Sequence, residues 1–294
     1  MSRQAELAIV RGAYAKQILA AGGIRDERIE AAFAAVPRED FLGPSPWSMF
    51  RFPNAFVPTP APDPVYVYVD QVVGLIPERN INNGQPSMHA MLMAAAQIKE
   101  GEHVVHVGAG AGYYSAIMAK LTGPCGKVTA IEFDASLAAR ARDNLSSLPQ
   151  VKVLEGDGSL VSFDAADVIY VNAGVTHPAE SWLDGLSDGG RLILPLTANS
   201  NFPSPSGCFD PAKAVRSGAF FRIQSRGTTF EARGLIPTLI IPAEGVRDQA
   251  SEAALAAAFE KGGWNGVTRL VRDNSVADMD QCWVRGPGWC LAFG

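Results

Sequence analysis

The sequence predicts an α/β fold built on a mostly parallel sheet, and three observations lead to that prediction. Short apolar runs alternate with helical stretches from about residue 81 to residue 197. The runs are apolar throughout, which is typical of parallel strands covered by helices on both faces. The first run, VVHV, leads directly into GAGAG. A glycine-rich turn between a strand and a helix lies at the ligand-binding edge of such sheets.

An N-terminal helical and proline-rich arm, residues 1–77, is expected before this region. Apolar residues recur at helical spacing at Leu7, Val10, Tyr14 and Ile18, and a second helix begins after a capping residue, Asp26, and ends at Pro37. Residues 44–64 contain seven prolines and no periodicity. The composition of that stretch indicates an ordered, extended loop rather than a regular element.

The central domain is expected to span residues 78–243. We predict helices over 86–98, 113–121, 135–145 and 179–186, and strands over 103–107, 127–132, 152–155, 167–172 and 191–196. Two further strands, 219–225 and 230–241, are separated by a short turn and predict an antiparallel hairpin at one edge of the sheet. A C-terminal α+β extension, residues 244–294, would contain a helix over 249–261, capped by Asp248, and short final strands.

Composition argues against several classes of partner. The net charge is −5 and the sequence pI is about 5.4. No cluster of Lys and Arg would create the positive electrostatic potential that attracts nucleic acid. No run approaches the roughly 20 apolar residues of a membrane span, and the first residues lack the continuous apolar segment of a secretory signal. We therefore expect a cytoplasmic protein. The four cysteines show no CxxC spacing, so we expect thiols and no metal site.

Three alternating glycines, Gly108, Gly110 and Gly112, form the predicted turn. Glycine allows the backbone to adopt positive φ and to approach a ligand closely. A dinucleotide fingerprint would require a glycine at position 113, where this chain has Tyr113. The spacing therefore favours a smaller ligand whose ribose and carboxylate lie over the loop.

Two acids at the ends of the next strands narrow the choice of ligand. Glu132 ends the second strand, where a carboxylate can accept hydrogen bonds from both ribose hydroxyls, and Asp157 follows the third, where it can accept from an adenine amine. Ribose, adenine and a carboxylate together are the parts of S-adenosylmethionine. The sequence therefore predicts a site for this methyl donor.

The chain also resembles the protein-L-isoaspartate O-methyltransferase family from about residue 24 to residue 197. The segments that carry the resemblance are VPREDF, GQPSMHAMLM, VGAGAGYYSAIMA, VTAIEFD, ARDNL, EGDG and GGRLILP, which follow in the family's order. The resemblance implies a Rossmann-like sheet of seven strands that binds S-adenosylmethionine. It also implies transfer of the methyl group to a carboxylate of a peptide or protein.

The resemblance also assigns roles to residues. The segment Asn82–Gln85 would contribute to catalysis through Asn82 and Gly84. His177 is a further catalytic candidate because of its own position just beyond the fourth strand, not because of the resemblance. The residues that would contact the cofactor come from several segments: Asn83, Gln85, His89, Gly108, Ala109, Gly110, Gly112, Tyr113, Glu132, Phe133, Asp157, Gly158 and Asn172.

The chain departs from the family at two positions. Gly84 stands where the family has a hydroxyl residue associated with catalysis, and His106 stands where an acid precedes the glycine turn. The first departure puts isoaspartyl activity in question. We expect that replacing Gly84 with serine would raise that activity in an otherwise intact pocket.

Three functions remain open from the sequence. A carboxylate acceptor is ionised at neutral pH and needs no general base. A small-molecule alcohol or phenol would need one, for which His89 or His177 is the candidate. The third possibility is a cofactor-binding module that acts through protein contacts without catalysis. The oligomeric state is not predicted.

Overall fold

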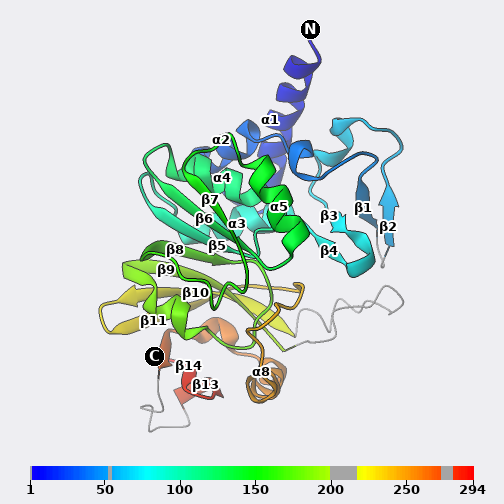
Figure 1. Ribbon diagram of the computed structural model, residues 1–294. Coiled ribbons are helices and arrows are strands. Elements are labelled where there is room, and N and C mark those ends of the chain that lie inside the picture. The colour runs from blue at the N-terminus through cyan, green and yellow to red at the C-terminus, as the bar shows by residue number, and fades with distance from the viewer. Residues whose placement is uncertain (1, 52–54, 199–216, 273–280) are drawn as a thin grey trace. The chain divides into compact units, whose positions relative to one another are not determined.

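A computed structural model describes residues 2–51, 55–198, 217–272 and 281–294 of the chain (Figure 1). These residues form two compact units. The first unit contains residues 2–51, 55–102 and 109–155, and the second contains 103–108, 156–198, 217–272 and 281–294. Each unit is therefore assembled from segments that are distant in the sequence. Among the described residues, no helix has the length and apolar character needed to cross a membrane.

Two helices open the first unit, as predicted. Helix α1 spans Arg3–Ala21 and α2 spans Glu27–Ala35. The carboxylate of Asp26 accepts hydrogen bonds from the N–H groups of the second and third residues after it, which confirms the expected cap. The apolar stripes of both helices are buried: Tyr14, Ile18 and Leu19 in α1, and Ile29, Ala32 and Phe33 in α2.

The proline-rich arm contains strands, so the prediction of a loop over residues 44–64 is wrong. Strands β1 (Ser48–Arg51) and β2 (Ala55–Pro58) form a hairpin, and the sheet continues through β3 (Val73–Ile76) to β4 (Ile81–Asn82) in the order β2-β1-β3-β4. All observed pairs are antiparallel. Short 3-10 helices lie over Glu39–Phe41, Pro64–Val67 and Pro77–Arg79.

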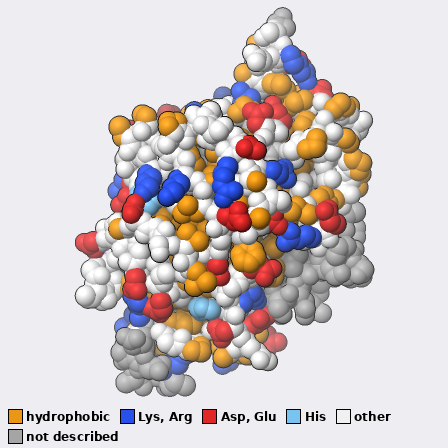
Figure 2. Space-filling view, viewed as in Figure 1, with side chains coloured by type: hydrophobic (Ala, Val, Ile, Leu, Met, Phe, Trp, Pro, Cys, Tyr) orange, Lys and Arg blue, Asp and Glu red, His pale blue; other side chains and the backbone are white. Residues whose placement is uncertain are grey.

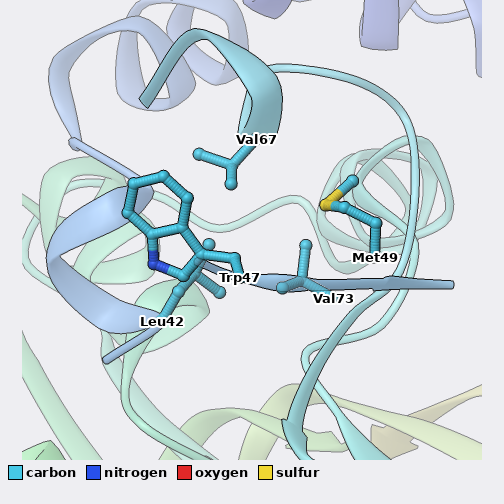
Figure 3. Packing of buried hydrophobic residues seen from close by; sticks show 5 residues of the cluster. All are labelled: Leu42, Trp47, Met49, Val67 and Val73. Carbon is cyan, nitrogen blue, oxygen red and sulfur yellow. The ribbon is translucent and has the colours of Figure 1, made fainter. Parts of the chain in front are cut away.

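A small apolar cluster explains why this arm folds despite its prolines. Its buried members come from the segment before the hairpin, from β1 and from the segment after the hairpin, and Figure 3 shows their side chains: Leu42, Trp47, Met49, Val67 and Val73. The indole N–H of Trp47 donates to the carbonyl of Gly43 at 3.0 Å. Burial of a large aromatic ring provides the free energy that strand length alone would not supply.

A buried arginine connects the arm to the segment that follows it. Arg38 is 0% exposed, and its guanidinium donates to the carbonyls of Val67 (2.7 Å), Val69 (2.9 Å) and Gln71 (2.7 Å). A fourth hydrogen bond, of 3.3 Å, reaches Oδ1 of Asn83. One side chain thus fixes a bend in the backbone and the start of the predicted catalytic segment.

The rest of the first unit is a β-α-β arrangement with helices around it. Strands β6 (Lys127–Glu132) and β7 (Val151–Glu155) are parallel. The helices of this part are α3 (Pro86–Ala96), α4 (Tyr113–Thr122) and α5 (Ala135–Asn144). The predicted helix over 86–98 ends earlier because Gln97 adopts a left-handed conformation, with φ +52°.

The second unit is a mixed sheet. Its strands are β5 (His103–Val107), β8 (Ala166–Val171), β9 (Leu186–Thr197), β10 (Gly218–Arg226), β11 (Thr229–Pro237), β12 (Arg269–Arg272), β13 (Cys282–Gly286) and β14 (Trp289–Ala292). Strands β5, β8 and β9 are parallel. From β9 the order continues β10-β11-β12-β14-β13 with antiparallel pairs. The hairpin β10–β11 is therefore not at an edge, because β12 from the C-terminal region pairs with β11.

Helices α6 (Glu180–Asp184) and α8 (Gln249–Lys261) and a 3-10 turn at Trp264–Gly266 complete this unit. The range of α8 matches the prediction, and Oδ1 of Asp248 accepts from the N–H of Ser251 as a cap. The predicted helix over 179–186 is shorter because β9 already begins at Leu186. The expectation of four thiols is also wrong, because Cys282 and Cys290 form a disulfide between β13 and β14.

Charges of both signs are interspersed on the face shown in Figure 2, with no large field of one sign. The chain contains similar numbers of basic and acidic residues, 25 and 30. Electrostatic steering of a highly charged partner needs a surface dominated by one sign.

Replacement of Arg38 tests how far the arm depends on this side chain. We expect Arg38→Met to lower the free energy of unfolding by about 3 kcal/mol, because four buried or partly buried acceptors lose a charged donor. Urea denaturation followed by circular dichroism measures this change. Arg25→Met, at an exposed arginine, is the control and should change stability little. Equal effects of the two substitutions would contradict the role given to Arg38.

Candidate functional site

The segment Asn82–Gln85 is held in place by hydrogen bonds within the first unit. Oδ1 of Asn82 accepts from the N–H of Gly84 at 2.9 Å, and Oδ1 of Asn83 accepts from the N–H of Val73 at 3.0 Å. The side chain of Gln85 donates to Asp70 at 3.1 Å. The same carboxylate accepts from the N–H of Ser87 at 2.8 Å, in the first turn of α3. The backbone of the predicted catalytic segment is thereby fixed.

The side chain of His89 fills the space beside Gly84. Gly84 has φ +72°, and a Cβ atom on it would lie 2.3 Å from Nε2 of His89. His89 is fully buried, and its ring stacks on that of Tyr114 with centroids 3.6 Å apart. The imidazole thus fills the volume that a side chain at position 84 would need. The serine substitution expected from the sequence to restore activity therefore carries a steric cost that the sequence does not reveal.

The glycine turn of the first unit carries the features that a small ligand requires. Gly110 has φ +57°, and its N–H donates to Oε2 of Glu132 at 2.7 Å. The N–H of Ala109 donates to the carbonyl of Ile131 at 3.1 Å, so the turn is tied to the end of β6. Gly112 caps α4 with φ +96°, where a Cβ would lie 2.7 Å from Leu145.

Glu132 is 8% exposed, so its carboxylate is nearly withdrawn from water. This burial raises its pKa, while the N–H groups of Asp134 and Gly110 act in the opposite direction. Each carboxylate oxygen accepts one backbone hydrogen bond and retains further acceptor capacity. The next residue, Phe133, is 54% exposed. A fixed, buried acceptor beside a glycine turn is suited to the hydroxyls of a ribose.

Tyr113 packs inside the first unit. It is 3% exposed, and its hydroxyl lies 3.5 Å from that of Tyr14. Its ring contacts those of Phe33, Phe41 and Tyr114 with centroids 5.0–6.3 Å apart. Burial raises the pKa of this hydroxyl well above its usual value. The placement favours a packing role over the contact with the cofactor that was expected for Tyr113.

Within the second unit, Gly108 and Asn172 lie together at the ends of β5 and β8. The N–H of Asn172 donates to the carbonyl of Val107 at 2.8 Å, and its side chain donates to that of Gly108 at 3.4 Å. A Cβ on Gly108, which has φ +76°, would lie 3.2 Å from the carbonyl oxygen of Asn172. His106, two residues before the turn, is fully buried, and this lowers its pKa to about 3. We therefore infer that His106 is a neutral core residue.

The two carboxylate oxygens of Asp157 have different surroundings. Oδ1 accepts from both the N–H and the hydroxyl of Ser159, at 2.8 and 2.7 Å. The following residue, Gly158, is fixed by the indole of Trp182, which donates to its carbonyl at 2.8 Å. A Cβ at Gly158 would lie 2.4 Å from the side chain of Val107, so only glycine fits there. The loop after β7 is therefore rigidly supported.

His177 is paired with a residue from the C-terminal region. Its Nδ1 lies 3.0 Å from Oδ2 of Asp248, and the two side chains are 30% and 39% exposed. Although partial burial acts to raise it, the pKa of Asp248 is lowered overall by hydrogen bonds from Ser251 and by the proximity of His177. This arrangement orients the imidazole through Nδ1.

The predicted site residues divide between the two units. Asn82, Asn83, Gly84, Gln85, His89, Ala109, Gly110, Gly112, Tyr113, Glu132 and Phe133 belong to the first unit, and Gly108, Asp157, Gly158, Asn172 and His177 to the second. Arg38, Asp70 and Asp248 support these groups and were not predicted to do so. The motif VPRE contains Arg38, but its buried contacts have no signature in the sequence.

A protein-family comparison supplies the observation that decides the family. Residues 13–203 match the profile of protein-L-isoaspartate(D-aspartate) O-methyltransferase. This match covers more than half of the chain. The chain belongs to the protein-L-isoaspartate(D-aspartate) O-methyltransferase family. Membership confirms the family predicted from the sequence, together with the enzyme class and the methyl donor that the family implies.

Individual methyltransferases agree with this membership. The protein-L-isoaspartate O-methyltransferase of Thermotoga maritima is 31% identical over 196 residues, which are 65% of this chain and 57% of that protein. A solved protein-L-isoaspartate O-methyltransferase aligns over 97% of this chain and 87% of its own, with a TM-score of 0.65 at 20% identity.

A second solved structure is a protein-L-isoaspartate O-methyltransferase from Plasmodium falciparum in complex with S-adenosyl-L-homocysteine. It aligns over 79% of this chain and 97% of its own, with a TM-score of 0.59 at 16% identity. These structural matches confirm the predicted α/β methyltransferase fold.

The fit between Gly84 and His89 can be tested with a matched pair of glycines. Gly23 also has a positive φ, +64°, but no atom lies within 4 Å of the position of its Cβ. We expect Gly84→Ala to lower the free energy of unfolding by about 1–3 kcal/mol more than Gly23→Ala does, because only the former overpacks the core. In a His89→Ala background this excess should vanish. Denaturant titration of the four variants decides, and an excess that persists without His89 would contradict the shared space.

Proposed function

We propose that this chain transfers the methyl group of S-adenosylmethionine to a carboxylate of a peptide or protein. The observation that carries the proposal is the buried carboxylate of Glu132 bonded to the glycine turn at Gly110. A buried acid of this kind needs hydrogen-bond donors, and a ribose diol supplies two of them. The family membership supports the reaction class.

The finer architecture is part of this proposal. We infer a Rossmann-like sheet whose core is the seven strands β5 to β11, extended beyond β11 by β12, β14 and β13, in a methyltransferase domain over 78–243, with an N-terminal arm (1–77) and a C-terminal extension (244–294). The parallel pairs β6–β7, β5–β8 and β8–β9 and the antiparallel hairpin β10–β11 support it.

The bound donor supplies an electrophilic methyl group on a sulfonium. The residues of the chain then have to bind the donor and the acceptor and orient them toward each other. We propose that Glu132 holds the ribose and Asp157 the adenine amine, while the turn at Gly108, Ala109, Gly110 and Gly112 leaves room for the donor's carboxylate. Phe133, exposed beside Glu132, is suited to stack on the adenine ring. Alignment of acceptor and methyl group accounts for most of the rate enhancement in such a displacement.

The acceptor side is proposed to lie at Asn82–Gln85. A carboxylate acceptor is already ionised, so this segment only has to position it. Asn82, Asn83 and Gln85 carry amides, and three hydrogen bonds hold their side chains: Asn82 accepts from the N–H of Gly84, Asn83 accepts from the N–H of Val73, and Gln85 donates to Asp70. The hydroxyl that the family carries at position 84 is replaced here by a buried imidazole. We therefore propose an isoaspartyl or a related carboxylate as acceptor.

A small-molecule hydroxyl acceptor is the second candidate, and one observation favours it. The pairing of His177 with Asp248 orients the imidazole so that Nε2 can accept a proton. His89, which is fully buried, is less suited to be this base.

Binding of the cofactor product tests the role of Glu132. We expect Glu132→Gln to raise the dissociation constant of S-adenosylhomocysteine by roughly ten- to a hundredfold, because hydrogen bonds to a charged acceptor are lost. Isothermal titration calorimetry measures it. Glu155→Gln is the matched control, since Glu155 lies opposite Glu132 in the register of the neighbouring strand and is exposed. Unchanged affinity in Glu132→Gln would refute the ribose site.

Methyl transfer tests the acceptor. We expect radiolabelled S-adenosylmethionine to methylate a peptide containing L-isoaspartate and not its normal aspartyl counterpart. His177→Gln should leave this turnover within about twofold, since an ionised acceptor needs no base. Loss of turnover in His177→Gln, or transfer only to hydroxyl compounds, would favour the small-molecule reaction instead.

A further inference from the structure

After β11, the chain runs parallel to the residues just beyond the end of β8 in the second unit. Residues 241–248, which we call the return segment, pair with the residues just beyond β8. The N–H of Gly174 donates to the carbonyl of Ile241 at 2.7 Å, and the N–H of Ala243 donates back to Gly174 at 2.8 Å. The N–H of Thr176 donates to Val246 at 3.2 Å. The whole return segment lies outside residues 13–203, which match the family profile.

Two side chains fix the far end of the return segment. The guanidinium of Arg247 donates to the carbonyl of Gly174 at 2.9 Å and to the hydroxyl of Thr197 at 3.0 Å. The N–H of Asp248 donates to the hydroxyl of Thr176 at 2.8 Å. The segment is therefore anchored to the ends of β8 and β9 both before and after Gly245.

Gly245 lies directly against Asp157. It has φ +92°, and a Cβ atom on it would lie only 2.0 Å from Oδ2 of Asp157. Oδ1 is already engaged with Ser159, so Oδ2 is the oxygen that faces the return segment. Any side chain at 245 would have to displace this carboxylate or the return segment. Glycine is therefore required there both by the backbone conformation and by the contact.

We propose that the return segment is the outer wall of the nucleobase subsite, and that Gly245 is the residue that gives an exocyclic amine access to Oδ2 of Asp157. This inference rests on the proposed function, in which Asp157 accepts the adenine amine. A carboxylate oxygen has two acceptor directions. Because Gly245 has no Cβ, the carboxylate of Asp157 keeps its position, and Oδ2 retains acceptor capacity for an exocyclic amine, so the subsite selects 6-aminopurine over 6-oxopurine.

Alanine substitutions at two glycines, Gly245 and Gly227, test whether the return segment forms this wall. Gly227 has φ +62°, in the same region, and no atom lies within 4 Å of the position of its Cβ. Calorimetry compares S-adenosylhomocysteine with its inosine analogue, in which oxygen replaces the exocyclic amine. We expect the wild-type protein and Gly227→Ala to prefer the adenosine form by roughly tenfold or more. Gly245→Ala should bind it at least about tenfold more weakly and lose most of that preference.

The outcomes separate this inference from the proposed function. If the wild-type protein binds S-adenosylhomocysteine and Gly245→Ala keeps both its affinity and its preference, the wall is refuted while the methyl-donor site stands. If the wild-type protein does not bind it, both fail.

A measurement on the wild-type protein covers the case in which Gly245→Ala does not fold. Hydrogen–deuterium exchange in the amides of residues 241–248 should slow when S-adenosylhomocysteine is added. Exchange that is unchanged by the ligand at saturation would overturn the wall, and protection in these residues would support it.

Discussion

The first unit depends on one buried cation. The guanidinium of Arg38 is surrounded by backbone carbonyls of residues 67–71 and by the amide of Asn83. A buried charge without such acceptors would be strongly destabilising, and carbonyls without such a donor would be left unsatisfied. Each therefore requires the other. Because Asp70 lies in this bend and binds Gln85 and the start of α3, Arg38 determines where the predicted catalytic segment lies.

Gly84 and His89 show how a departure from the family can be compensated within the fold. A glycine at position 84 removes a side chain from the candidate acceptor segment, and the imidazole of His89 occupies the space. The stacking of His89 on Tyr114 holds the ring there. The two residues therefore form a single steric unit, and neither can be altered by itself to recover the family's arrangement.

The sequence predicts best the elements that have clear boundaries. Strands His103–Val107 and Lys127–Glu132 and helix Gln249–Lys261 agree with their predicted ranges because glycines or a capping aspartate border them. The hairpin β1–β2 was missed because its strands have four residues each among several prolines, and the cluster around Trp47 stabilises it through contacts distant in sequence. The disulfide was missed because a spacing of eight residues matches no motif.

In the candidate site, too, some features are predictable from the sequence and others are not. Local motifs identify the glycine turn, Glu132 and Asp157, since a strand end and its turn are adjacent in the sequence. The contact of Gly245 with Asp157 joins residues 88 positions apart. No periodicity or motif records such a contact, because it arises only when β11 and the return segment pair with other parts of the second unit.

The C-terminal region also controls the chemistry available to His177. Oδ1 of Asp248 is engaged as the cap of α8, while Oδ2 lies 3.0 Å from Nδ1 of His177, and the hydroxyl of Thr176 lies 3.2 Å from the same nitrogen. The start of α8 thus contributes to the orientation of the ring, and the N–H of Asp248 is itself held by Thr176. A histidine within the family-matched region consequently takes its geometry from residues outside it.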